Sequence, residues 1–278
     1  MANKNTMGLI ASLYERKKMP LVMGILNVTP DSFYAKSRKE SVSSACDAAL
    51  SMEASGADII DIGAESTRPG FKDVPAEEEA ERLIPAIMEI RRHTQVPISV
   101  DTRKGSVARA ALDAGADIVN DISAGTYDFS IIEIVKNYKC DIILMHSQEK
   151  ALYSDVVFEV KDYLVSRAEA FENAGVPADR ITLDPGLGFG KETDHNLALM
   201  RCTDEFVRLG YPVLIGCSRK RFIGAVTGAD VDGRLAGTLT VNAFAALHGA
   251  AVLRVHDVRE TSDMVKMLHA LGSDMVRR

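Results

Sequence analysis

The residues of this chain that could do chemistry stand at the ends of eight short apolar runs. A single Asp in such a place is common, because Asp is a frequent helix N-cap and loop residue. Acids, amides and bases at all eight ends are better explained by side chains that converge on one polar mouth. The sequence therefore predicts an enzyme or a small-molecule binder. The polar residues are Asn27; Asp61; Asp101; Asn120 and Asp121; His146; Asp184; Ser218, Arg219 and Lys220; and Arg254, His256 and Asp257.

Four of these residues, Asp101, Asn120, Asp184 and Lys220, form one set. Carboxylates that face into a closed structure are costly unless a partner or ligand satisfies them. A planar heterocycle with an amino-amide edge would do so, because its N–H groups suit Asp184, Asn120 can donate and accept, and Lys220 can meet a ring carbonyl oxygen. Lys220 could instead simply neutralise Asp184, and the sequence leaves both interpretations open.

A second group, Asn27, Arg254 and His256, is called the diphosphate set. Arg254 and His256 are two residues apart in the last run, so on a strand they would share a face. Asn27 ends the first run, which neighbours the last run if eight parallel strands close into a barrel. An arginine, a histidine and an amide oxygen together suit a diphosphate and its Mg²⁺, with Asn27 as metal ligand. Taken alone, His256 would more often be a hydrogen-bonded core histidine.

Two further patterns give no phosphate loop and no zinc site. The segment from Gly186 to Lys191 resembles a phosphate loop, but Pro185 stands where the first glycine belongs and Glu192 replaces the Ser/Thr. Lys191 also replaces the last glycine of the dinucleotide-binding pattern. The sequence has no HExxH motif and no close His/Cys pair, which argues against zinc.

The elements that must position these side chains alternate along the chain. Each run is rich in Ile, Val and Leu, as expected for a parallel strand covered on both faces. The segments between the runs are amphipathic. Pro75 and the glutamates at 77–79 suit a helix start, and Leu83, Ile87 and Ile90 belong to one buried stripe. The runs are 21–28, 57–64, 98–102, 117–123, 141–146, 181–186, 212–218 and 250–257. Glycines that could end helices in a left-handed conformation are Gly56, Gly115, Gly175, Gly210 and Gly249.

Eight strand–helix units predict one α/β domain, a (β/α)₈ TIM barrel at 20–278 after an N-terminal extension at 1–19. An open doubly wound sheet is the alternative. The net charge of −6 and the lack of Trp argue against a nucleic-acid partner. No apolar stretch approaches the roughly 18 residues that suggest a membrane span. The four cysteines form no CxxC pair and are typical of buried, reduced thiols, so we expect a cytoplasmic protein.

At these residues the chain resembles the dihydropteroate synthases, from about residue 20 to residue 271. Several of the matching motifs are long, and all of them come in the order of the family. The motifs are MGILNVTPDSF at 23–33, DIGAESTRPG at 61–70, VDT at 100–102, NDIS at 120–123, MH at 145–146, DPGLGFGK at 184–191, SRK at 218–220 and RVHDV at 254–258.

The resemblance implies a barrel, usually a homodimer, that condenses a dihydropterin diphosphate with p-aminobenzoate by early, SN1-like loss of diphosphate. Carried over by motif, Asp101, Asn120, Asp184 and Lys220, called the pterin set from here on, would hold the pterin, and the diphosphate set would hold diphosphate and Mg²⁺. The residues expected to be catalytic are Asp101, Lys220, Arg254 and His256. Those expected around p-aminobenzoate are Phe33, Thr67, Arg68 and Pro69 on mobile loops, Ser218, and Arg221 at the following helix start.

The chain departs from the common family form in places outside both sets. Residues 34–38, YAKSR, replace the usual Ser-Asp-Gly-Gly of the first loop, and residues 147–150, SQEK, replace a frequent Met-x-Gly-Thr-Pro. Ala64 replaces a glycine. The changed first loop leaves one rival hypothesis, a non-catalytic pterin-binding homologue. A second rival is a pterin-dependent methyltransferase on the same barrel, which would pass a methyl group to a corrinoid protein.

Overall fold

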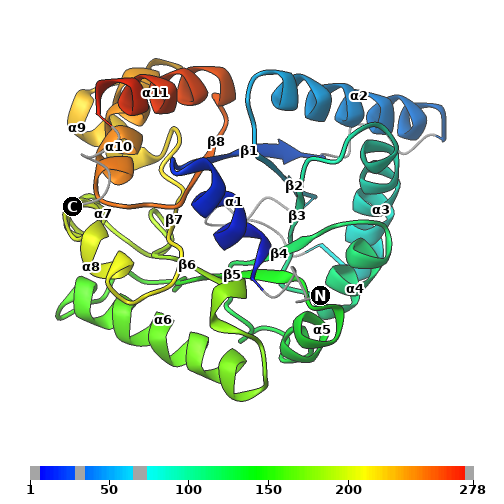
Figure 1. Ribbon diagram of the computed structural model, residues 1–278, viewed down its shortest axis with the longest axis horizontal. Helices are drawn as coiled ribbons and strands as arrows, with labels where there is room; N and C mark the ends of the chain where they lie inside the picture. Colours follow the sequence, from blue (N-terminus) through cyan, green and yellow to red (C-terminus); the bar gives the residue numbers. More distant parts are fainter. Residues whose placement is uncertain (1–6, 29–34, 65–73, 273–278) are drawn as a thin grey trace.

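The fold was obtained as a computed structural model, which describes residues 7–28, 35–64 and 74–272. Within these residues, eight parallel strands alternate with helices that surround them (Figure 1). The strands are β1 Leu21–Asn27, β2 Ile59–Gly63, β3 Ile98–Asp101, β4 Ile118–Asp121, β5 Asp141–Met145, β6 Ile181–Asp184, β7 Leu214–Ile215 and β8 Val252–Val255. The helices are α1 Leu9–Lys17, α2 Ala35–Ala54, α3 Ala76–His93, α4 Gly105–Asp113, α5 Ser130–Tyr138, α6 Val156–Asn173, α7 Thr193–Arg201, α8 Thr203–Val207, α9 Arg221–Thr227, α10 Leu235–Leu247 and α11 Val258–Leu271.

The strands close into a ring. Their order is β6-β5-β4-β3-β2-β1-β8-β7, and each paired neighbour runs parallel. An isolated bridge between Leu183 and Val213 joins the two ends, and the Leu183 N–H donates to the Pro212 carbonyl at 2.9 Å. The predicted (β/α)₈ barrel is therefore confirmed, and the alternative of an open doubly wound sheet is wrong.

Side chains on the strands alternate between two separate cores, as the period of two requires. One set faces the helices and packs with them, and the other fills the lower half of the barrel. Members of the helix-facing set include Val22, Ile60, Ile62, Val100, Val119, Ile142, Leu144 and Leu253. Members of the inner set include Leu21, Met23, Ile59, Ile118, Ile143, Leu214 and Val252. The next inward positions along the strands carry the polar residues of the predicted site.

Helix α1 lies across the N-terminal end of the barrel, in front of the ring of strands in Figure 1. Its Ile10 is fully buried against the inner core. The carboxylate of Asp141, which starts β5, accepts the N–H groups of Leu9 and Ile10 at 3.0 and 2.8 Å. These bonds satisfy two of the backbone donors that a helix start leaves free. The segment predicted as an extension thus contains a helix that plugs the barrel.

Helix α3 follows the predicted pattern with one difference. Pro75 is the N-cap, one residue before the helix begins, and Leu83, Ile87 and Ile90 are fully buried as expected. Glu79, expected only to face the positive end of the helix dipole, is buried completely. Its Oε2 lies 2.6 Å from Nζ of Lys104, which pays for removing the carboxylate from water.

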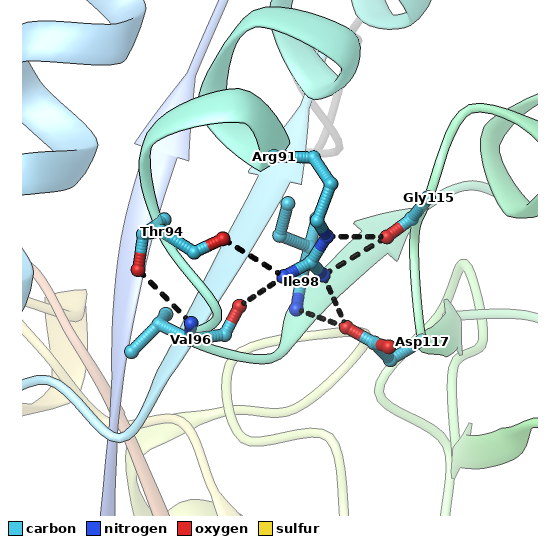
Figure 2. Close-up of polar contacts among 6 residues, drawn as sticks. All are labelled: Arg91, Thr94, Val96, Ile98, Gly115 and Asp117. Atoms are coloured by element: carbon cyan, nitrogen blue, oxygen red, sulfur yellow. Dashed lines mark hydrogen bonds and ion pairs between the residues drawn. The ribbon is translucent and has the colours of Figure 1, made fainter.

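The turn that leads from α4 into β4 is tied to the end of α3 by Arg91 (Figure 2). The guanidinium donates to the carbonyls of Gly115 at 2.9 and 3.0 Å and of Val96 at 3.0 Å, and it pairs with Asp117 at 2.5 Å. Gly115 has a φ of +111°, a conformation that L residues rarely adopt. Left-handed glycines were predicted before five strands, and the φ values of Gly56, Gly115, Gly175, Gly210 and Gly249 confirm all five.

The four cysteines are free thiols; three are buried as predicted, and Cys202 is only partly buried. No helix among the described residues is long and apolar enough to cross a membrane.

Candidate active site

The C-terminal end of the barrel interior is polar because the inward-facing side chains change from apolar to polar two residues beyond the inner core. Each polar residue stands two positions after an inward-facing core residue of the same strand, so it faces inward as well. The pairs are Ile59 and Asp61, Ile118 and Asn120, and Val252 and Arg254. Asp101 pairs in register with Asn120 on the neighbouring strand. The residues of the barrel mouth are therefore positioned by the same alternation that builds the core below them.

Arg254 bridges two carboxylates at the centre of this mouth. Its Nε lies 2.6 Å from Oδ2 of Asp61, and its Nη2 lies 2.8 Å from Oδ2 of Asp101. Asp61 is fully buried and Asp101 is 8 % exposed, so water screens these contacts little. Burial opposes the charge of Arg254, but the two carboxylates outweigh it and raise the pKa of the guanidinium. The three residues form one charged unit.

Asp101 offers an acceptor that the protein does not use. Its Oδ1 is buried and has no hydrogen-bond partner among the described residues. Burial raises the pKa of Asp101 to about 7, Arg254 works against this rise, and Asp61 adds to it. A buried carboxylate oxygen without a partner is costly, so this oxygen is suited to receive an N–H or a positive charge from a ligand.

Asn120 is held in one orientation by Asp61. Its Nδ2 donates to the Asp61 carboxylate at 3.2 and 3.4 Å. Because a carboxylate only accepts, the amide NH₂ must face Asp61, and the amide oxygen is then directed elsewhere as an acceptor. Asp61 thus orients Asn120 and Arg254 together. The sequence placed Asp61 at a strand end but gave it no role in the site; its inward parity with Ile59 was the signal that could have found it.

Asp184 closes the other side of the same cup. Its Oδ1 accepts the Gly186 N–H at 2.7 Å, and burial raises its pKa, against the effect of Lys220. A Cβ placed on Gly216 would be 3.9 Å both from Oδ2 of Asp184 and from Cβ of Arg254. Asp184 and Arg254 therefore flank one glycine, so the structure brings these two predicted site residues together.

Lys220 reaches this wall from the segment after β7. Its ammonium donates to the carbonyl of Leu187 and lies 4.8 Å from the centre of the Phe189 ring. Burial lowers its pKa to about 8, and Asp184 opposes that change. The hydrogen bond of Lys220 goes to the Leu187 carbonyl, and its charge also opposes the effect of burial on the pKa of Asp184.

The diphosphate set is less compact than the sequence predicted. Strand β8 ends at Val255, so His256 lies beyond it and is exposed, with its Nδ1 3.0 Å from Oγ of the buried Ser218. The alternation argument that paired His256 with Arg254 therefore does not apply, and the interpretation of His256 as a core histidine is wrong. Asn27 is exposed at the end of β1, and its Oδ1 and the Cβ of Asp101 lie on the same face of Gly63.

The remaining predicted positions are outside the cup or outside the described residues. Arg221 is exposed at the first position of α9. In the described ranges no group of three or more His, Cys, Asp or Glu side chains is arranged to hold a metal. The predicted p-aminobenzoate residues that lie outside the described residues are Phe33, Thr67, Arg68 and Pro69.

Comparison with known proteins agrees with this geometry. The pterin binding enzyme family matches residues 23–256 of the chain. A dihydropteroate synthase of Streptococcus pyogenes is 44% identical over 252 residues, which are 90% of this chain and 95% of that protein. The solved structure of the Xanthomonas albilineans dihydropteroate synthase with 4-aminobenzoic acid superposes with a TM-score of 0.86 at 44% identity, covering 91% of this chain and 93% of that chain. The same enzyme in complex with 7,8-dihydropteroate gives a TM-score of 0.83 at 42% identity, over 91% and 94% of the two chains.

A closed parallel barrel with acids, an amide and bases around one inward cup has the form of a barrel enzyme, and the matched family makes it a pterin-binding enzyme. The order of the motifs and the extent of the match narrow this class further. The chain belongs to the dihydropteroate synthase family.

Proposed function

We propose that this enzyme condenses (7,8-dihydropterin-6-yl)methyl diphosphate with p-aminobenzoate, giving 7,8-dihydropteroate and diphosphate in folate biosynthesis. The observation that carries the proposal is the charged unit of Asp61, Arg254 and Asp101 inside a barrel mouth that also holds Asn120 and Asp184. Its Xanthomonas albilineans relatives, solved with 4-aminobenzoic acid and with 7,8-dihydropteroate, support both the second substrate and the product.

The pterin set supplies the groups that a pterin edge needs. The Asp184 carboxylate accepts from the N–H groups of the ring, and the Asn120 oxygen accepts from another. The Lys220 ammonium, already bound to one carbonyl, can also donate to the ring carbonyl oxygen. The unpartnered Oδ1 of Asp101 would accept a hydrogen bond from the same ligand, so binding would replace a buried, unsatisfied oxygen by a hydrogen-bonded one.

The leaving group is held at the rim by Asn27, His256 and the exposed edge of Arg254. Asn27 presents an amide oxygen at the end of β1, and Mg²⁺ commonly takes one or two protein oxygens together with substrate phosphates and water. The residues present therefore fit a magnesium ion that arrives with the diphosphate. When bound, the ion supplies positive charge to the diphosphate oxygens.

The reaction is proposed to begin with cleavage of the C–O bond to diphosphate, whose oxygen keeps both electrons. The electron-rich dihydropterin stabilises the remaining cation, and the negative charge of Asp101 lies beside the ring to favour it. The amine nitrogen of p-aminobenzoate then forms the C–N bond with its lone pair and releases a proton to water. An arylamine is neutral near pH 7 and already nucleophilic, so no strong general base is needed.

The p-aminobenzoate site is proposed to combine the segment after β7 with the residues that the family resemblance assigns to this substrate. Its residues would be Phe33, Thr67, Arg68 and Pro69 with Ser218. The carboxylate of p-aminobenzoate would rest near the start of α9, where Arg221 adds positive charge.

We also propose a cytoplasmic homodimer. Large apolar side chains are exposed on the last helices of the chain, including Phe244 on α10 and Met267 and Leu271 on α11. An exposed apolar face of this kind is typical of an interface between subunits. Light scattering after gel filtration would give the mass of a dimer, and a monomer at micromolar concentration would contradict this part of the proposal.

The reaction is tested by measuring diphosphate release from the dihydropterin diphosphate in the presence of Mg²⁺, with and without p-aminobenzoate. We expect release that depends on both substrates and appearance of 7,8-dihydropteroate. A non-catalytic homologue would bind the pterin in isothermal titration without releasing diphosphate. A pterin-dependent methyltransferase would instead transfer a methyl group to a corrinoid protein, and either outcome would overturn the proposal.

A further inference from the structure

The segment 186–191, which resembles a phosphate loop in sequence, has a different use in the fold. Its glycines Gly186, Gly188 and Gly190 have φ values of +67°, +82° and +61°. A Cβ on Gly186 would lie 1.9 Å from the His146 carbonyl oxygen, and one on Gly190 would lie 2.1 Å from that of Gln148. The glycines are therefore required because this segment runs directly against the backbone that follows β5.

Lys191 fastens the two segments together. Its Nζ lies 2.9 Å from Nδ1 of His146, 3.3 Å from the His146 carbonyl oxygen and 3.0 Å from the Phe189 carbonyl oxygen. Across the described ranges, no carboxylate lies within ion-pair distance of this ammonium, so its three contacts are all with neutral acceptors. Burial, with the charge of Lys191, lowers the pKa of His146 to about 3, and the neutral ring leaves Nδ1 free to accept. Tyr153 adds a second fastening, because its hydroxyl donates to the Gly190 carbonyl at 3.0 Å.

The opposite edge of the segment 186–191 touches Lys220 of the pterin set. The Leu187 carbonyl accepts a hydrogen bond from the Lys220 ammonium, and the Phe189 ring lies 4.8 Å from it. A Cβ on Gly188 would be 3.2 Å from Cδ of Lys220, so the stem of that lysine also packs here. Lys191 thus binds one edge of the segment 186–191, and Lys220 packs against the opposite edge.

We propose that Lys191 is a positioning residue, which sets the place of Lys220 by clamping the segment 186–191 onto the segment after β5. This inference rests on the proposed function, because Lys220 matters through its contact with the pterin. Lys191 itself need not touch the substrate. Its removal would leave two carbonyls and a ring nitrogen without their donor and would release the backbone that holds Leu187 and Phe189.

The test is a double-mutant cycle in which kcat/KM for the dihydropterin diphosphate is measured for Lys191→Met, Lys220→Met and the double variant. Misplacement of a contacting group by about 1 Å commonly costs about 100-fold, so we expect Lys191→Met to lose about 10- to 100-fold. In the Lys220→Met background the same change should cost less than about 2-fold, because the group it positions is already gone. Lys161→Met, which removes a partly buried lysine paired with Glu205 on the outer helices, is the matched control and should keep full activity.

Two results would overturn the inference: full activity of Lys191→Met, or an equal loss in both backgrounds, which would mean that Lys191 acts on the reaction by itself. If Lys191→Met does not fold, Lys191→Gln retains a shorter donor and enters the same cycle. A wild-type enzyme that releases no diphosphate in the presence of both substrates would refute the proposed function instead, and this outcome is separate from the cycle.

Discussion

Replacing Arg254 by methionine keeps much of the side-chain volume and removes the cation that bridges Asp61 and Asp101 at 2.6 and 2.8 Å. Breaking a buried ion pair from one side costs about 3–5 kcal/mol, because a charge is left without compensation. Loss of a donor that stabilises charge in the transition state costs about 2.7–4 kcal/mol. We therefore expect kcat/KM to fall by about 100-fold or more and the free energy of unfolding to fall as well.

The loss of stability in Arg254→Met should depend on pH in a defined direction. The pKa of Asp101 is already raised to about 7 by burial, and Arg254 opposes that rise, so its removal raises the pKa further. A carboxyl group whose folded pKa is raised contributes its stability below the unfolded pKa of about 3.9, and loses it as the pH rises through the folded value. The destabilisation should therefore be larger near pH 8 than near pH 5.

Urea unfolding of the wild type and the variant at both pH values measures this difference, and diphosphate release measures activity. Arg91→Met is the matched control: its side chain is 22% exposed against 23% for Arg254, and it also pairs with an aspartate, but it lies outside the barrel mouth. It should lose stability and keep kcat/KM. Equal destabilisation of Arg254→Met at the two pH values, or activity above about a tenth of wild type, would refute the reasoning.

Three further changes separate the parts of the molecule. Asp61→Asn removes the carboxylate that orients Asn120, so it should weaken pterin binding by about 1.5–3 kcal/mol. The KM for the diphosphate substrate should then rise about 10-fold or more, and an unchanged KM would contradict this. Arg219 has a φ of +55° and donates two hydrogen bonds to Asp257, at 2.6 and 3.0 Å. Because either change removes the same ion pair, Arg219→Met and Asp257→Asn should lower kcat/KM equally. A double variant that is worse than either single variant would show that the two residues act separately. Ile10→Ala should lower the free energy of unfolding by about 2–5 kcal/mol without changing kcat/KM, because the plug lies at the far end of the barrel; a stable variant with altered activity would refute that.

Local features of the fold could be predicted closely from the sequence. The apolar runs became the strands, although every strand is shorter than its run. The run at 212–218 contains only Leu214–Ile215 as a strand. The run records burial, whereas the strand ends where parallel hydrogen bonds end, so the two boundaries need not coincide. Helix-ending glycines such as Gly115 were predictable because the chain adopts a positive φ there, and residues with a side chain rarely adopt it.

The position of His256 could not be predicted in the same way. Its alternation with Arg254 holds only while the strand continues, and β8 ends at Val255. The two residues consequently have different surroundings: Arg254 lies among buried acids, and His256 is exposed beside Ser218. Strand ends are the least certain boundaries of an element, and functional residues of a barrel lie at those ends.

By itself, the sequence determined the class of this protein: a parallel barrel with polar strand ends, the inward acids of a pterin site and the motifs of one family. Only the tertiary structure decided which of those groups lie close enough to form ion pairs and hydrogen bonds. Arg254 meets Asp61 and Asp101 across 193 and 153 residues of chain, and Lys191 reaches His146 across 45. Such contacts depend on the closure of the ring and on the register of its strands, because these bring residues from distant parts of the chain together. A local pattern of residues does not specify which distant residues will meet.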